Sequence, residues 1–238
     1  MRVLTAIPVY NEQAHLEPVL DEVLRHAGDV LVVDDGSTDR TPELLRNFPQ
    51  VQVIRHSRNL GYGAGLRSAF NRAIESRYDG LVTIDCDGQH EPSLIPMIAA
   101  RLDEAEIVSG SRYLQVFDPD QVPPEQRRRI NVEVTRWLNE CLGFDLTDAF
   151  CGFKAYSTAA LSRFEITEDG YAMPLQLWVQ AAQHDMKVIE VAVPLIYLDE
   201  SRAFGGALDN AEFRLNHYRT VFQGALKRAG LEIAGGRC

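Results

Sequence analysis

The sequence has no apolar run near the roughly twenty residues that a membrane-spanning helix needs. Its N-terminus also lacks the basic and then apolar pattern of a secretory signal, because a strand-like stretch begins almost at once. We therefore expect a cytoplasmic protein, whose closest approach to a bilayer is peripheral contact with the inner face of the membrane.

Basic residues are fewer than acidic residues in this sequence. The cysteines are also few, and their spacing does not match a metal site. The 24 Lys and Arg residues face 34 Asp and Glu residues, which gives a formal net charge of −10. Such an acidic chain repels nucleic acid, so we expect no nucleic-acid partner. The four cysteines show neither CxxC nor another paired metal spacing. With 238 residues the chain has room for one α/β domain, and we predict a single domain over 1–238.

Three apolar stretches lead directly into acidic residues. Residues 4–9, 30–33 and 81–84 are apolar enough for buried strands, and carboxylates follow each of them within a few positions. Helix-length segments separate the stretches, which predicts successive βα units. Because the carboxyl ends of parallel strands lie at one edge of a sheet, we expect these acids to meet in one ligand-binding crevice.

The third strand end is the most informative, because Asp85-Cys86-Asp87-Gly88-Gln89 follows it. Two aspartates one residue apart present hard oxygen ligands of the kind that divalent cations prefer. A solvated turn after a strand is the alternative, since Asp and Gly are common there too. The acidic strand ends upstream favour a site over a turn.

Five segments, in this order, resemble the motif series of family 2 glycosyltransferases with the GT-A fold. They are Pro8–Glu12, Val33–Asp39, Asn59–Gly63, Asp85–Gln89 and Gly110–Arg112. A later segment, Thr147–Tyr156, resembles the polyprenol-phosphate (dolichol-phosphate) mannosyl- and glucosyltransferase branch. The resemblance implies an α/β, GT-A fold, with a Rossmann-like, mostly parallel sheet flanked by helices.

The resemblance also implies a reaction and a set of site residues. The reaction is metal-dependent, inverting transfer of a hexose from a nucleotide sugar, of the GDP-mannose or UDP-glucose type, most directly to polyprenyl phosphate. The implied nucleotide-binding residues are Pro8, Tyr10, Glu12, Val33, Asp35, Asp85, Arg112 and Arg202. The implied ligands of Mg²⁺ or Mn²⁺ are Asp85, Asp87 and Gln89, and the implied catalytic residues are Asp87, Asp169 and Arg128.

Two acceptor classes stay open. A sugar hydroxyl of a glycan would need a general base, and Thr167-Glu168-Asp169 resembles the base motif of hydroxyl-directed family 2 enzymes, with Asp169 as the base. A lipid phosphate is already ionised and needs no base. The two acids also fit a helix start that the helix dipole favours. The run Arg127–Arg129 could neutralise phosphate, with a solvated helix start as the alternative.

The chain divides into three predicted parts. We expect a nucleotide-binding half over about 1–115, an acceptor half over about 116–210 and a C-terminal amphipathic helix over about 211–238. Prolines in 111–130 predict a long loop that leads into a helix around 132–142. The C-terminal helix is expected to pack on its own domain or on a second subunit, which makes a homodimer one expected assembly.

Two functions of other classes fit parts of the sequence. The segment Asp85–Gly88 also resembles the nucleophile loop of haloacid-dehalogenase-type phosphatases. That loop normally follows the first strand, and it carries Thr or Val where this chain has Gln89. A non-catalytic nucleotide-sugar-binding protein with the same fold would bind without turnover, and the intact Asp85, Asp87 and Arg112 argue against it.

Overall fold

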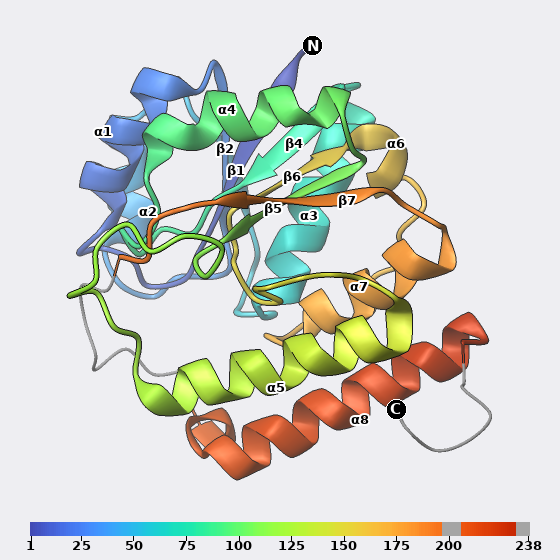
Figure 1. The fold of residues 1–238 in the computed structure, drawn as a ribbon. Coiled ribbons are helices and arrows are strands. Elements are labelled where there is room, and N and C mark those ends of the chain that lie inside the picture. Colours follow the sequence, from blue (N-terminus) through green and yellow to red (C-terminus); the bar gives the residue numbers. More distant parts are fainter. Residues whose placement is uncertain (197–205, 232–238) are drawn as a thin grey trace.

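Seven strands form one sheet at the centre of the protein (Figure 1). The computed structural model describes residues 1–196 and 206–231. In chain order the strands are β1 (Val3–Val9), β2 (Asp29–Asp34), β3 (Gln52–Arg55), β4 (Gly80–Thr83), β5 (Ile107–Ser111), β6 (Lys154–Ser157) and β7 (Val188–Ala192). The helices are α1 (Leu16–His26), α2 (Thr41–Leu44), α3 (Tyr62–Glu75), α4 (Ile95–Ala100), α5 (Glu125–Leu142), α6 (Thr158–Leu161), α7 (Met173–Gln183) and α8 (Ala211–Ala229).

The sheet is mostly parallel. Its strand order is β3-β2-β1-β4-β6-β5-β7. Strand β1 pairs in parallel with β2 and β4, and β5 pairs in parallel with β7, whereas β6 runs antiparallel between β4 and β5. The predicted α/β class, with a mostly parallel sheet flanked by helices, is confirmed.

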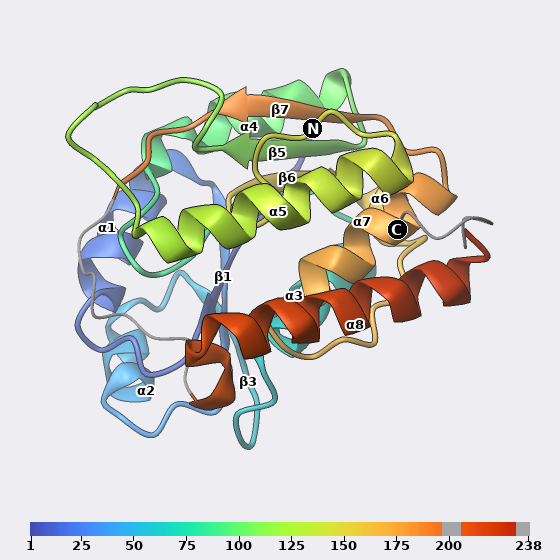
Figure 2. The same ribbon diagram turned by 60° about the horizontal axis from the view of Figure 1, so that its bottom comes forward.

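Both faces of the sheet are covered, which explains why the central strands β1, β2 and β4 are mostly apolar and buried. In β2, Leu31 and Val33 pack into one hydrophobic cluster while Val30 and Val32 pack into the other, as the two-residue alternation of a strand requires. Helices α1 and α4 cover one face; α3 and α7 lie on the other, with α5 and α8 below them (Figures 1 and 2).

Helix α5 begins at Glu125, so the prediction of a loop to residue 130 and a helix from about 132 is wrong at its start. The prolines of this segment predict a loop, although the helix starts directly after the last of them. Pro124 stands immediately before the helix, where a residue without an N–H leaves no backbone partner unsatisfied. Ile130, Val134 and Leu138 are buried at four-residue spacing, so Arg127–Arg129 lie in the first turns of the helix.

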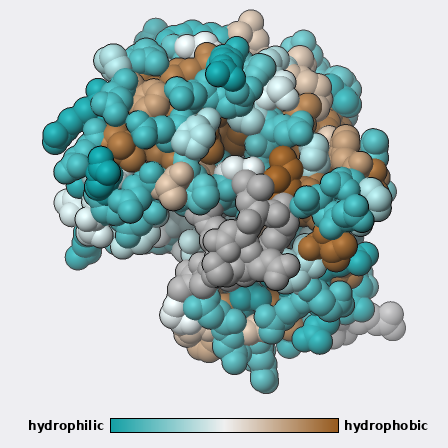
Figure 3. All heavy atoms as spheres, turned by 90° about the vertical axis from the view of Figure 1, so that its left-hand side faces the viewer, coloured by the Kyte–Doolittle hydropathy of each residue, from teal (hydrophilic) through white to brown (hydrophobic). Residues whose placement is uncertain are grey.

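The carboxyl ends of the parallel strands meet at one edge of the sheet. Figure 3 views the molecule from the side toward which β5 and β7 point in Figure 1. Hydrophilic residues dominate this side, and the hydrophobic ones form small separate groups (Figure 3). The segments that the sequence marks as functional leave their strands here.

Candidate active site at the carboxyl edge of the sheet

A cavity of about 600 Å³, called the strand-edge cavity below, lies at this edge. It brings together eight of the residues predicted from the sequence. They are Pro8, Tyr10, Glu12, Asp35, Asp85, Asp87, Gln89 and Arg112. Segments far apart in the sequence therefore converge as the strand-end pattern predicts, because β1, β2, β4 and β5 all end at this point.

Three other predicted residues, Val33, Asp169 and Arg128, do not line the cavity, and a fourth lies outside the described part of the chain. Val33 is fully buried in the core beneath it, and Arg202 lies outside the described residues. The Asp169 carboxylate is 56% exposed and pairs with Arg67 at 2.7 Å. Arg128 is exposed, whereas its neighbour Arg127 lines the cavity, because successive helical residues point about 100° apart.

Asp35 holds the loop that follows β3. One of its carboxylate oxygens accepts from the Leu60 N–H at 2.9 Å and lies 2.6 Å from His56 Nδ1. The other accepts from the Gly61 N–H at 2.7 Å. Each carboxylate oxygen has two lone pairs, so the second oxygen keeps acceptor capacity toward the cavity. Asp35 thus shapes the cavity wall as well as lining it.

The glycines of Gly61-Tyr62-Gly63 are explained by a close approach of two backbones. Gly61 has a φ of +109°, and a Cβ at this position would lie 2.3 Å from the carbonyl oxygen of Asp169. A Cβ on Gly63 would lie 2.3 Å from the carbonyl oxygen of Glu168. The Ala64 N–H donates to the Asp169 carbonyl at 3.2 Å. The Glu168-Asp169 backbone therefore docks against the start of α3.

Asp85 lies on the floor of the cavity and is held by neighbours on three sides. The Tyr62 hydroxyl donates to it at 3.1 Å, and His90 Nε2 lies 3.4 Å from its other oxygen. Gly152 packs directly against the carboxylate, and a Cβ at this position would force the carboxylate to move. Burial alone would raise the pKa of Asp85, but these hydrogen bonds and the charge of Arg112 lower it. The carboxylate is thus ionised at neutral pH.

The loop after β4 supplies a donor set that suits a hard divalent cation. Asp85, Asp87 and Gln89 offer carboxylate and amide oxygens at alternate positions, and all three line the cavity. Asp87 accepts from the Gln89 N–H at 3.0 Å, which shapes the turn. Among residues 1–196 and 206–231, no cluster of three His, Cys, Asp or Glu side chains could hold a metal alone. The oxygen donors of these three residues are of the kind that Mg²⁺ or Mn²⁺ prefers, and a cation held by them would need further ligands from outside this set.

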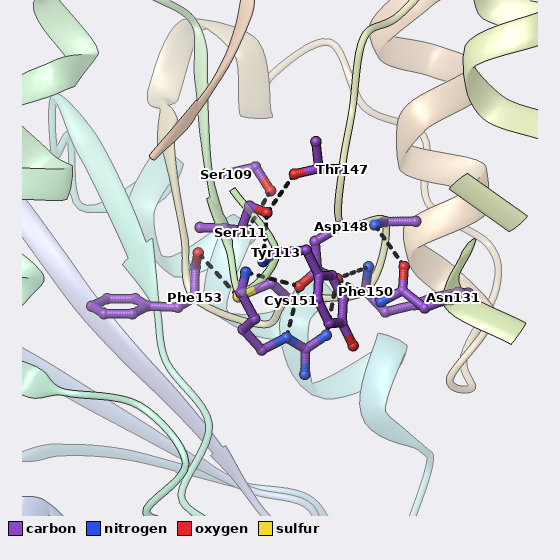
Figure 4. A network of polar contacts seen from close by, with 12 residues as sticks. Ser109, Ser111, Tyr113, Asn131, Thr147, Asp148, Phe150, Cys151 and Phe153 are labelled. Carbon is purple, nitrogen blue, oxygen red and sulfur yellow. Dashed lines mark hydrogen bonds and ion pairs between the residues drawn. The ribbon is translucent and has the colours of Figure 1, made fainter. Parts of the chain in front are cut away.

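Arg112 is fixed by a fully buried acid, Asp148. Figure 4 shows Asp148 with its neighbours Asn131 and Phe150. The Nε and Nη2 of Arg112 donate to the two Asp148 oxygens at 2.7 and 2.9 Å. The Asn131 amide donates to Asp148 at 2.7 Å, and the Phe150 N–H donates at 3.2 Å. Burial opposes ionisation, yet Arg112 and Asn131 hold the pKa of Asp148 well below its ordinary range. Asp148 therefore serves both as the anchor of Arg112 and as the support of the turn before β6.

A second wall of the cavity is basic, and sequence reasoning found only part of it. Arg127 of α5 and Arg214 of α8 both line the cavity, and Arg214 is only 3% exposed. Arg214 Nη1 donates to the Leu208 carbonyl at 2.6 Å. Burial lowers the pKa of Arg214, and the positive charge of Arg127 lowers it further. The available signal was a charged residue in the buried row Arg214, Tyr218 and Phe222 of an amphipathic helix.

The family model described as "Glycosyl transferase family 2" matches residues 5–164. The chain belongs to this family. It is a glycosyltransferase with the GT-A fold, so the phosphatase alternative is excluded, and Asp85 indeed follows the fourth strand rather than the first.

Relatives of this family 2 glycosyltransferase match almost its whole length. An undecaprenyl-phosphate mannosyltransferase of Micrococcus luteus is 31% identical over 97% of this chain and 100% of its own. A polyprenol monophosphomannose synthase of Mycolicibacterium smegmatis is 28% identical over 96% of this chain and 90% of its own.

A solved structure shares its fold. Glucosyl-3-phosphoglycerate synthase from Mycobacterium tuberculosis, in complex with UDP, superimposes with a TM-score of 0.71 at 20% identity. The match covers 98% of this chain and 82% of that chain.

Across residues 1–196 and 206–231, none of the helices combines the length and apolar content that crossing a membrane requires.

Proposed function

We propose that this glycosyltransferase moves a hexose from a nucleotide sugar to a polyprenyl phosphate, with inversion at the anomeric carbon. Acidic and basic side chains line different parts of the strand-edge cavity, and this separation is the observation that supports the proposal. Its carboxylates follow β1, β2 and β4, whereas its arginines come from the end of β5 and from α5 and α8. The two substrates each carry phosphate, and together they need both kinds of side chain. The nucleotide sugar would bind through a cation held by the carboxylates, and the polyprenyl phosphate would bind the arginines directly.

The donor occupies the acidic end in this proposal. Pro8, Tyr10 and Glu12 form the wall after β1, and Asp35 with its anchored loop forms the wall beside it. Glu12 and the remaining acceptor capacity of Asp35 suit the N–H and O–H groups of a base and a ribose. Relatives named as mannosyltransferases and a fold neighbour in complex with UDP support a GDP-mannose or UDP-glucose type of donor.

Asp85, Asp87 and Gln89 would hold Mg²⁺ or Mn²⁺ at the junction of the two ends. The bound cation would offset the negative charge that develops on the departing diphosphate. The fold neighbour has also been solved with Mn²⁺ and UDP, which supports a divalent cation here. Arg112, held rigid by Asp148, would contribute a fixed positive charge beside the same phosphates.

The acceptor occupies the basic end, where Arg127 and Arg214 would orient its phosphate. A phosphate oxygen attacks the anomeric carbon as the bond from that carbon to the diphosphate breaks, and the bonding electrons leave with the diphosphate. The attacking oxygen is already anionic, so no residue must remove a proton. This fits the position of Asp169, whose carboxylate pairs with Arg67 and does not line the cavity.

Transfer of labelled sugar to matched lipids tests the proposal. GDP-mannose and UDP-glucose would each be incubated with the protein, Mn²⁺ and either a short-chain polyprenyl phosphate or the same polyprenol without phosphate. We expect labelled product only with the phosphate and only with the cation. Labelled product from the unphosphorylated alcohol, or from a sugar hydroxyl in place of either lipid, would reject the phosphate acceptor.

A further inference from the structure

The outward stripes of α5 and α8, called the α5–α8 face below, carry an excess of positive charge on an acidic molecule. The exposed charged residues of the two helices are six basic ones, Arg128, Arg129, Arg136, Arg219, Lys227 and Arg228, against three acidic ones, Glu125, Glu140 and Glu212. The whole chain, by contrast, has 24 basic and 34 acidic residues. The two helices thus depart from the charge of the rest of the protein.

Exposure places this charge on one surface. In α5 the exposed residues Arg129, Val132, Arg136 and Glu140 recur every three or four positions, and Arg128 is exposed next to the first of them. Those of α8 recur in the same way and include Phe213, Arg219 and Lys227. Figures 1 and 2 both show the two helices side by side on the outside of the molecule. Residues at these spacings share one side of a helix, so each helix presents a single stripe to solvent.

A network between the helices fixes the two stripes relative to each other. The Arg219 guanidinium lies 3.6 Å from the Glu133 carboxylate and 4.9 Å from the centre of the Trp137 ring. Within the described residues, no ion pair joins Arg128, Arg129, Lys227 or Arg228 to an acid, so their charge is not cancelled by a neighbour. Two large apolar side chains stand among them, Val132 at 57% and Phe213 at 52% exposure.

We infer that the α5–α8 face docks on the anionic surface of a lipid bilayer; this inference rests on the proposed lipid-phosphate acceptor. Basic side chains near an anionic leaflet are attracted within a Debye length, and the two apolar side chains can enter the interface between head groups and acyl chains. The inner sides of the same two helices supply Arg127 and Arg214 to the cavity. A lipid with its phosphate beside these two arginines and its tail in the bilayer would bring the bilayer close to α5 and α8.

A second copy of the chain fits the same face less well. Protein interfaces of ordinary size are depleted in charged residues at their core and enriched in aromatic ones, whereas this face has mostly charged and polar side chains. A partner protein seated there would also separate the cavity from the membrane. Self-association is nevertheless a measurable outcome, and it separates the two possibilities.

Flotation with phosphatidylcholine vesicles, made with and without phosphatidylglycerol, tests the inference. We expect binding only with phosphatidylglycerol, and loss of that binding in high salt. The triple variant Arg129→Glu, Lys227→Glu, Arg228→Glu should partition at least about tenfold more weakly. The matched control Arg25→Glu, Arg46→Glu reverses exposed charges on α1 and beside α2, and it should bind vesicles like the unaltered protein.

A soluble acceptor separates failure of this inference from failure of the proposed function. With a short-chain polyprenyl phosphate in solution, the triple variant should retain its rate within about twofold, while transfer to a long-chain acceptor in vesicles should fall in parallel with binding. Turnover of the soluble acceptor without vesicle binding, or equal binding by the variant and control proteins, would reject the docking surface. A charge-dependent dimer in sedimentation velocity, without vesicle binding, would assign the face to a second copy. Absence of any turnover of the soluble acceptor would reject the proposed function instead.

Discussion

The two ends of the strand-edge cavity are built by different means. At the acidic end, Glu12, Asp35 and Asp85 each follow a strand of the parallel sheet by a few residues, so the sheet alone determines where they meet. At the basic end, Arg127 and Arg214 come from helices that are distant in the sequence. Their meeting depends on how α5, α7 and α8 pack. The acidic end is therefore fixed by local chain geometry, and the basic end by tertiary packing.

Breaking the acidic end should give the largest effect. Asp87→Asn removes one carboxylate of the proposed cation shell, so we expect turnover to fall on the order of a thousandfold, and Mn²⁺-dependent binding of a nucleoside diphosphate to disappear. Calorimetric titration with and without Mn²⁺ measures the binding. Asp103→Asn, an exposed acid outside the cavity, is the control and should match the unaltered protein. Unchanged metal-dependent affinity in a folded Asp87→Asn protein would remove Asp87 from the site.

The junction between the two ends should show the next largest effect, on stability. Asp148→Ala leaves the charge of Arg112, whose side chain is only 19% exposed, without its partner, so we expect the free energy of unfolding to fall by about 3 kcal/mol. Urea unfolding measures it, with the exposed Asp145→Ala from the same loop as the control.

The pH dependence of that stability has a definite sign. The pKa of Asp148 is lower in the folded protein than its ordinary value of 3.8, so its contribution is complete above that value. The contribution shrinks as pH falls toward the folded pKa, because protonation then breaks the pair. The difference between the unaltered protein and Asp148→Ala should therefore be constant near neutral pH and narrow in strong acid. A difference that widens on acidification would contradict the ion pair as its source.

The sequence predicts the acidic end of the cavity better than the basic end. Apolar strands that end in acid are a pattern of a few residues, so Asp85, Asp87 and their sheet edge were predictable. Asp148 was visible as an acid, but its pairing with Arg112 needed the turn before β6 to be placed in space. Arg128 was favoured over Arg127 because the phase of a helix depends on its start, and the prolines concealed that start. Arg214 needed the packing of a whole helix.

Arg214 sharpens the comparison at the basic end. Arg214→Gln keeps polar contacts but removes a buried charge from the proposed acceptor wall, so we expect the KM for a short-chain polyprenyl phosphate to rise about tenfold. Donor affinity should change by less than about twofold, because the donor end is built from other elements. Steady-state rates at varied acceptor concentration measure the first effect, and calorimetry measures the second. Arg228→Gln on the same helix is the control. Equal losses of donor and acceptor affinity would mean that the two ends are not independent.

Asp169 should give the smallest effect, and it separates the two acceptor classes. Its carboxylate is half-exposed and paired with Arg67, a kind of ion pair that contributes less than about 1 kcal/mol, and only its backbone is needed against Gly61 and Ala64. With an ionised acceptor, Asp169→Asn should keep its rate within about threefold, since no proton is removed in the transition state. A hydroxyl acceptor predicts a loss of about a hundredfold or more, because general-base catalysis would disappear. Initial rates of both proteins with the short-chain polyprenyl phosphate decide between them, and the Arg67→Gln variant controls for loss of the ion pair. A large loss of rate in Asp169→Asn, without a similar loss in Arg67→Gln, would identify this carboxylate as the general base. It would then favour a sugar hydroxyl as the acceptor.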